Sequence, residues 1–256
     1  MITSRTNKQI KWVRTLQSKR HARQTDRMFV IEGTRLFEEA LLAGRKPHLV
    51  LYTPEWGDRF PQLLGQLKSS QIQNEMVSEA VLAHCSDVET PQGVLAVLPI
   101  ETTLSPQPPA IALVLDRLAD PGNLGTILRT AQAAQVDVVY LTPGNVDVYN
   151  PKVVRAGMGA HFRLMIQEAP IEQIIAYLED LELWTAEARS GEVYHGIDWR
   201  KPVALAIGSE AHGIDPTLRA RASGQVHIPI ADHSESLNAA TAAAIILFEI
   251  QRQRGY

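Results

Sequence analysis

Continuous apolar runs alternate with amphipathic stretches along the second half of the chain. Four of these runs have the length of buried strands: 111–115, 136–141, 183–186 and 203–207. Strands that are apolar throughout are typical of parallel sheets, because helices cover both faces of such a sheet. Helical spacing of the apolar residues predicts helices near 124–134, 151–158, 170–180, 216–221 and 236–253. The pattern therefore predicts an α/β domain with a parallel sheet over residues 111–256.

A smaller alternation of strands and helices comes first. It predicts strands at 29–31, 48–52 and 94–98, and helices near 5–18, 33–43 and 60–68. We interpret residues 1–100 as a small α/β module that binds a ligand, since no catalytic constellation lies within it. Four prolines fall within residues 99–110, and we place a linker at residues 101–110.

Charge is distributed unevenly along the chain. Residues 1–27 contain eight lysine or arginine residues and one acid, a net charge of +7, whereas the whole chain carries −3. A basic arm on an otherwise acidic protein is typical of proteins that bind a polyanion such as RNA or DNA. The alternative is a solvated helix with a basic face.

Several classes of protein and site are excluded by the composition. The only cysteine, Cys85, excludes an internal disulfide and a cysteine-based zinc site, and with only His84 beside it we expect no metal. No apolar run approaches the 18 residues of a membrane span, so we expect no membrane partner. The N-terminus lacks an apolar signal core, and we therefore expect a cytoplasmic protein.

Three loops, each between a strand-like run and a helix, carry glycine, asparagine and ionisable groups. They comprise residues 120–125, 208–213 and 236–238. Such junctions lie at the carboxyl ends of strands, where α/β sheets bind their ligands. A short strand is expected at 226–230, with Pro229 near its end. We therefore expect one composite site.

Single residues within these motifs permit structural interpretations as well. Asn123 and Ser236 each suit the N-cap of a helix. Arg129 falls opposite the apolar stripe of its helix, where a guanidinium is able to hold a phosphate or polarise a hydroxyl. Lys152 and Arg155 share one face of a helix that Pro151 begins.

Taken together and in this order, the motifs resemble those of the SpoU (TrmH-like) RNA 2′-O-ribose methyltransferases of the SPOUT superfamily. In the second half, the similarity rests on residues 120–130, 150–156, 208–213, 228–230 and 236–238. In the first half, it rests on residues 4–11, 29–33 and 91–96, which are similar to the substrate-binding module of that family.

The resemblance implies a parallel-sheet domain with a deep trefoil knot, S-adenosylmethionine as cofactor, and a homodimer formed through the C-terminal domain. It implies backbone contacts to the cofactor from Gly208, Ile228 and Leu237. It implies a catalytic neighbourhood of Asn123, Arg129, Glu210, Ser236 and Asn238. The implied reaction is methyl transfer to a ribose 2′-hydroxyl of RNA.

The basic residues that we expect to contact RNA are Lys8, Lys11, Arg14, Arg20, Lys152 and Arg155. Ribosomal RNA is favoured over transfer RNA, because the N-terminal module resembles that of ribosomal RNA modifiers. Two alternatives stay open: a transfer RNA 2′-O-methyltransferase, and a non-catalytic RNA-binding protein on the same fold. A protein of the second kind is expected to lose Asn123, Arg129, Glu210 or Asn238, and all four are present.

Overall fold

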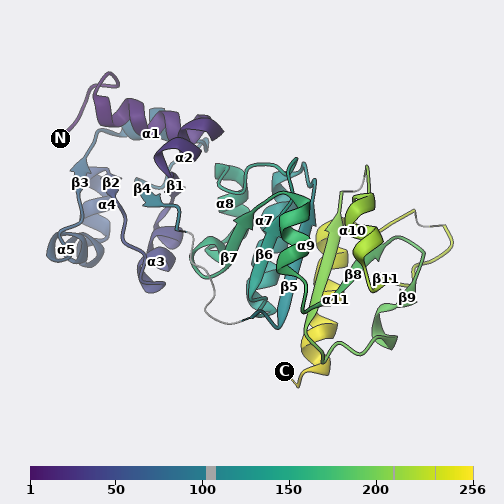
Figure 1. Cartoon of the computed structure of the whole chain (residues 1–256). Helices are drawn as coiled ribbons and strands as arrows, with labels where there is room; N and C mark the ends of the chain where they lie inside the picture. Colours follow the sequence, from purple (N-terminus) through teal and green to yellow (C-terminus); the bar gives the residue numbers. More distant parts are fainter. Residues whose placement is uncertain (102–107, 210, 234, 256) are drawn as a thin grey trace. The chain divides into compact units, whose positions relative to one another are not determined.

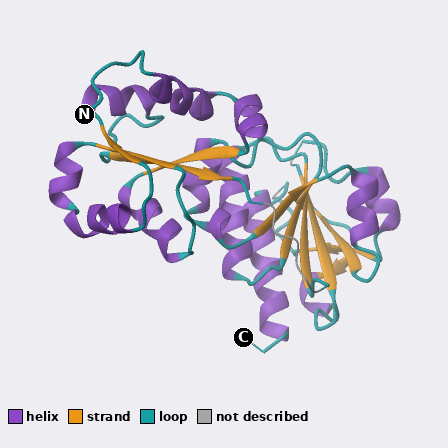
Figure 2. Cartoon of the chain, turned by 60° about the vertical axis from the view of Figure 1, so that its left-hand side comes forward, coloured by secondary structure: helices purple, strands orange, loops and turns teal. Residues whose placement is uncertain are grey.

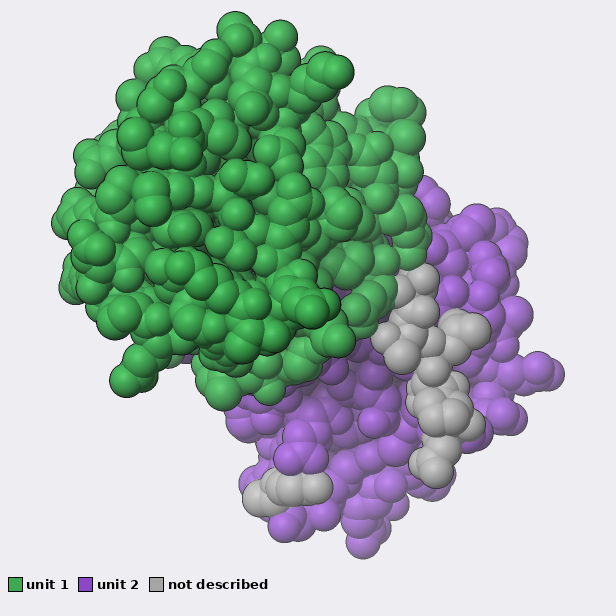
Figure 3. Space-filling view, turned by 90° about the vertical axis from the view of Figure 1, so that its left-hand side faces the viewer, with its two compact units in different colours: residues 1–101, 149–162 green, residues 102–148, 163–256 purple. Residues whose placement is uncertain are grey.

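The computed structural model describes residues 1–101, 108–209, 211–233 and 235–255. Two compact units divide the chain, as Figure 3 shows: unit 1 is Met1–Glu101 with Tyr149–Phe162, and unit 2 is Thr102–Val148 with Arg163–Tyr256. Most of the predicted linker at 101–110 lies outside the described residues. No described helix is long and apolar enough to cross a membrane.

Unit 1 contains a four-stranded sheet of order β1-β4-β2-β3, in which β4 is antiparallel to both neighbours (Figure 1). Its strands are β1 (Met28–Glu32), β2 (Leu49–Tyr52), β3 (Asn74–Met76) and β4 (Val94–Pro99). Its helices are α1 (Lys8–Ser18), α2 (Arg20–Asp26), α3 (Thr34–Leu42), α4 (Pro54–Arg59), α5 (Pro61–Ser69), α6 (Glu79–Cys85), α8 (Pro151–Gly157) and the 3-10 helix η1 (Ala160–Phe162). The three predicted strands and three predicted helices are present, whereas α2, α4, α6 and β3 were not predicted.

The segment 149–162 was expected in the C-terminal domain, but it packs within unit 1. Val154 and Phe162 are buried in the same apolar cluster as Phe29 of β1. The guanidinium of Arg45 donates a hydrogen bond to the Phe162 carbonyl at 2.9 Å. Burial of these apolar side chains stabilises the segment within unit 1. The predicted boundary is therefore wrong here, because unit 1 consists of two stretches that are separated along the chain.

Unit 2 is built on a seven-stranded parallel sheet of order β7-β6-β5-β10-β8-β11-β9, with helices on both sides (Figure 2). Its strands are β5 (Ile111–Asp116), β6 (Val138–Leu141), β7 (Met165–Glu168), β8 (Glu182–Glu187), β9 (Glu192–Val193), β10 (Val203–Gly208) and β11 (Gly224–His227). Its helices are α7 (Pro121–Ala133), α9 (Ile171–Tyr177), the 3-10 helix η2 (Tyr194–Gly196), α10 (Pro216–Arg221) and α11 (Ala239–Gln253).

The predicted parallel sheet is confirmed, with differences at the ends of three elements. Strand β11 ends at His227, so residues 228–230 lie in a loop rather than in a strand. Helix α11 begins at Ala239, so Asn238 caps it and Ser236 does not. Asp120, not Asn123, caps α7. All of these positions lie on the side of the sheet where the strands end.

A buried carboxylate joins three loops at this edge of the sheet. Asp116, at the end of β5, is 0% exposed. Its Oδ1 accepts a hydrogen bond from the Thr142 hydroxyl at 2.6 Å, and its Oδ2 accepts one from the Asp215 backbone N–H at 2.7 Å. The Arg117 guanidinium lies 3.1 Å from Oδ2. Asp116 thus connects β5, the end of β6 and the loop that follows β10.

A buried carboxamide strengthens the same edge. The side chain of Asn145 accepts a hydrogen bond from the Leu118 backbone N–H at 2.8 Å. Its amide nitrogen donates to the carbonyl oxygens of Leu115 and Thr142 at 2.9 and 2.7 Å. The loop that leads into α7 is therefore held by a side chain from the loop that follows β6.

Replacing Asp116 with asparagine should reduce stability. Asparagine has only one side-chain oxygen, so it can accept from Thr142 or from the Asp215 N–H but not from both, and its amide group then faces the other donor. We therefore expect the free energy of unfolding to fall by about 1–3 kcal/mol. Urea denaturation of both proteins measures this change. Asp137→Asn is the control, because a single oxygen of Asp137 accepts from both Ala110 and Ile111 and asparagine keeps that oxygen. An equal loss in both variants would contradict the role given to Asp116.

Candidate functional site

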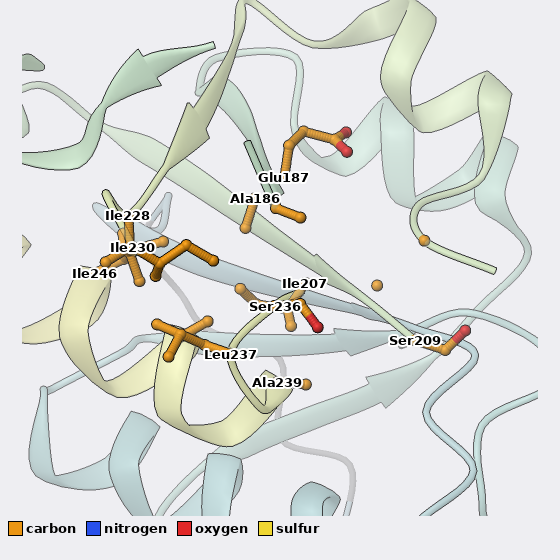
Figure 4. A pocket seen from close by; sticks show the side chains of 14 residues that line it. Ala186, Glu187, Ile207, Ser209, Ile228, Ile230, Ser236, Leu237, Ala239 and Ile246 are labelled. Atoms are coloured by element: carbon orange, nitrogen blue, oxygen red, sulfur yellow. The ribbon is translucent and has the colours of Figure 1, made fainter. Parts of the chain in front are cut away.

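A pocket in unit 2 opens where β8 and β10 end and α11 begins (Figure 4). The three residues expected to contact the cofactor, Gly208, Ile228 and Leu237, all line it, and so does Ser236. The other lining residues are Ala186, Glu187, Ala188, Ile207, Ser209, Gly213, Ile230, Ala239, Ala242 and Ile246. The structure thus brings the second and third predicted loops together around one cavity.

Gly208 occupies a position that has no space for a side chain. A Cβ atom there would lie 2.4 Å from the carbonyl carbon and oxygen of Gly213. The chain turns back at this point, with the Gly213 N–H donating to the Ser209 carbonyl at 2.8 Å. Any larger residue at 208 would displace the loop that forms one wall of the pocket. Glu210, predicted to be catalytic, falls outside the described residues.

The pocket has an apolar side and a polar side. Ile228, Ile230, Ile246 and Leu237 gather on one side of Figure 4, whereas the Glu187 carboxylate points away from them. The apolar side suits a flat, weakly polar ring. The polar side offers hydrogen-bond acceptors to hydroxyl or amino groups.

An ion pair that was not predicted holds the polar side. The carboxylate of Glu187, at the end of β8, lies 2.9 Å from the Arg219 guanidinium of α10. Only 14% of the Glu187 side chain is exposed. The sequence contained a weak signal for Glu187, since an acid directly follows the predicted strand 183–186.

The first and last predicted motifs meet outside this pocket. The amide nitrogen of Asn238 donates to the side-chain oxygen of Asn123 at 2.9 Å, across 115 residues of sequence. The oxygen of Asn238 accepts from the Ala240 N–H at 2.9 Å and so begins α11. Asn123 is itself held by Asp120, whose carboxylate accepts from its backbone N–H at 2.7 Å. Both asparagines are therefore fixed in position.

Arg129 lies on the exposed face of α7, as its position opposite the apolar stripe predicts. It does not line the pocket of unit 2. Across the part of the chain that the structure describes, its guanidinium forms no hydrogen bond or ion pair.

All six residues expected to contact RNA belong to unit 1. Lys8, Lys11, Arg20 and Lys152 are exposed. Arg14 donates to the Ser86 carbonyl at 3.3 Å, and Arg155 lies 3.2 Å from the Asp87 carboxylate. Arg14 and Arg155 therefore have structural contacts in addition to any role with RNA.

The single cysteine offers no chemistry at neutral pH. Cys85 is fully buried, and burial raises the pKa of its thiol to about 11. Within the described ranges, no cluster of three or more His, Cys, Asp or Glu side chains is arranged to hold a metal.

Two family models match the chain. Residues 110–248 match the SpoU rRNA Methylase family, and residues 7–96 match the MRM3-like substrate binding domain. The first match contains every residue that lines the pocket of unit 2, and the second lies within unit 1.

Individual relatives match over nearly the whole chain. The 23S rRNA (guanosine(2553)-2′-O)-methyltransferase RlmP of Bacillus subtilis is 32% identical over 254 residues, which cover 98% of each chain. The AdoMet-bound rRNA methyltransferase of Sinorhizobium meliloti is 31% identical with a TM-score of 0.88, covering 98% of this chain and 97% of that one. The AdoMet complex of AviRb from Streptomyces viridochromogenes is 27% identical with a TM-score of 0.86, covering 97% and 98%.

The motifs, the pocket that they form and the extent of these matches agree. The chain belongs to the SpoU rRNA methylase family.

Proposed function

We propose that this protein transfers the methyl group of S-adenosylmethionine to a ribose 2′-hydroxyl of ribosomal RNA. The observation that carries the proposal is the pocket lined by Gly208, Ile228, Leu237 and Ser236, within a domain of the SpoU family. RlmP, a guanosine 2′-O-methyltransferase of 23S rRNA, matches over nearly the full length. A ribosomal RNA substrate also favours a cytoplasmic location.

The pocket fits S-adenosylmethionine. When bound, the cofactor supplies a methyl group activated by a positively charged sulfur. The apolar wall of Ile228, Ile230 and Leu237 receives the adenine ring, and the absence of a side chain at Gly208 lets the backbone of Gly213 approach closely and complete the wall. The carboxylate of Glu187, held by Arg219, is an acceptor for the hydroxyl or amino groups of the cofactor.

Three of the residues expected to be catalytic, Asn123, Arg129 and Asn238, lie outside this pocket, whereas Ser236 lines it. A guanidinium keeps its proton under ordinary conditions, so Arg129 is a poor base. Instead, Arg129 binds the phosphate next to the reacting ribose and stabilises the negative charge that develops on the 2′-oxygen. Asn123 and Asn238, joined by their hydrogen bond, fix the position of the ribose. Alignment of the two reactants contributes roughly 7–11 kcal/mol to lowering the barrier.

A homodimer through α11 belongs to the same proposal. Phe248 of α11 is 51% exposed. Ala244 and Ile245, one helical turn earlier, lie beside it and are only partly buried. An exposed aromatic ring next to further apolar side chains is typical of a surface that another protein covers. We assign this face to a second copy of the chain, in keeping with the family resemblance.

The deep trefoil knot is also part of the proposal. The loops after β10 and β11 border the same pocket, and β10 lies between β5 and β8 in the sheet. The similarity to the Sinorhizobium meliloti enzyme, with a TM-score of 0.88, supports a knotted path through these loops. An experimental density map in which the loops pass each other unthreaded would contradict it.

Replacing Arg129 with alanine should reduce methyl transfer at least ~10²-fold, because the variant cannot stabilise charge in the transition state. Radiolabelled methyl transfer from S-adenosylmethionine to unmodified ribosomal RNA, with transfer RNA alongside, measures this. Cofactor affinity should not change, since Arg129 does not line the pocket. Arg221→Ala, an exposed arginine on α10, is the control and should retain activity. Full activity of the Arg129 variant would refute the assignment.

Replacing Lys8 and Lys11 with glutamine should weaken RNA binding. The plot of log affinity against log salt concentration has a negative slope, and its magnitude should decrease by about 0.7–0.9 for each phosphate that the variant no longer binds. Titration of ribosomal RNA at several salt concentrations measures the slope. Lys46→Gln with Lys68→Gln, two exposed lysines elsewhere in unit 1, removes the same charge. If both double variants show the same slope, the basic arm does not bind RNA.

Replacing Phe248 with aspartate should dissociate the dimer, because a carboxylate is costly to bury without a partner. Analytical ultracentrifugation should show at least a ~10-fold weaker self-association. Leu42→Asp changes a side chain that is 78% exposed on α3 of unit 1 and should leave the association unchanged. A wild-type protein that is monomeric at all concentrations would remove the basis of the proposal.

A further inference from the structure

Unit 1 contains a pocket of its own, far along the sequence from the cofactor-binding loops. It lies where β1 and β2 end and where α3 and α4 begin, and the loop at residues 90–93 and helix α6 complete its walls. None of the six basic residues that we expect to contact RNA lines it.

The floor and walls of this pocket are tightly packed. Trp56 is 2% exposed, and its indole N–H donates to the Thr34 hydroxyl at 2.9 Å. Gly93 has a φ of +85°, and a Cβ atom there would lie 2.9 Å from the Cβ of Trp56. The side-chain oxygen of Gln92 accepts from the Thr34 backbone N–H at 3.3 Å. Side-chain packing and hydrogen bonds within unit 1 therefore fix the walls of the pocket.

Five charged side chains line the pocket: Arg35, Glu38, Glu55, Arg59 and Glu79. All five are exposed, and within the described ranges none of them forms a salt bridge. The guanidinium of Arg59 instead lies over the Phe60 ring, 5.4 Å from its centroid. A matching ligand must offer acceptors to the arginines, donors to the carboxylates and a flat surface to Arg59.

We propose that this pocket binds one unpaired nucleotide of the RNA substrate and prefers guanine. A nucleotide phosphate accepts from Arg35 and Arg59, and proteins often stack unpaired bases on guanidinium planes. Guanine presents two adjacent N–H donors to a single carboxylate, whereas uracil presents one donor between two carbonyl acceptors. The inference rests on the proposed function, because it takes RNA as the substrate.

The pocket and the basic arm then have different tasks. Contacts to phosphates from Lys8 and Lys11 position RNA without regard to its sequence. The carboxylates of Glu38 and Glu55 touch the base edge and supply the selection. The matched substrate-binding domain, residues 7–96, contains both features.

Binding of two labelled RNAs to the full-length protein tests this assignment. One is a short oligouridylate, and the other is the same oligomer with a guanosine at its centre. Fluorescence anisotropy should show roughly tenfold tighter binding of the guanosine oligomer, the size of one bidentate base contact. Glu38→Gln with Glu55→Gln should abolish the preference, and Arg35→Gln should weaken binding of both oligomers.

Matched controls lie on the same unit. Asp58→Asn changes an exposed acid on α4 that does not line the pocket, and Lys68→Gln changes an exposed base on α5. Both should retain the preference and the affinity. Equal binding of the two oligomers by the wild type, or an unchanged preference in the double variant, would overturn the inference. Binding of an arginine-rich peptide without binding of either RNA would also overturn the inference.

Methyl transfer to ribosomal RNA by the wild type separates the two proposals. Transfer without a guanosine preference leaves the proposed function intact and removes the pocket assignment. A guanosine preference without any transfer supports the pocket as an RNA site and counts against the enzymatic proposal.

Discussion

The carboxylate of Asp116 is the group on which the site depends. It is fully buried, and it fixes the ends of β5 and β6 together with the loop that follows β10. Its hydrogen bonds are shielded from water, so they are stronger than equivalent bonds on the surface. One of the loops that border the pocket, the loop after β10, is held at Asp215 by this network. A single buried side chain thus anchors one of the loops that form the pocket.

Apolar periodicity was sufficient for the longer strands and helices of unit 2. The runs 111–115 and 203–207 became β5 and β10, because strands buried on both faces leave a continuous apolar signal. Short polar elements such as β3 (Asn74–Met76) and β9 (Glu192–Val193) leave no such signal. The pattern also assigned segment 149–162 to the wrong compact unit. Periodicity shows which side chains are buried, but it does not show which elements they pack against.

The site was predictable where motif residues act through the backbone or lie directly after a strand. Gly208, Ile228 and Leu237 line one pocket, as the motifs led us to expect. The contacts that hold the site together join distant residues: Asn123 with Asn238, Glu187 with Arg219, and Asp116 with Asp215. Pairs separated by 115, 32 and 99 positions leave no trace in a single sequence, because only the folded chain brings them together.

The return of the chain into unit 1 between β6 and β7 has a consequence for synthesis on the ribosome. Unit 1 emerges first, but its core includes Val154 and Phe162, which are added only after β5 and β6 of the other unit. Strand β1 therefore lacks part of its packing while the intervening residues, from 102 to 148, are translated. The core of unit 1 therefore reaches its full size only after residue 162 has been added.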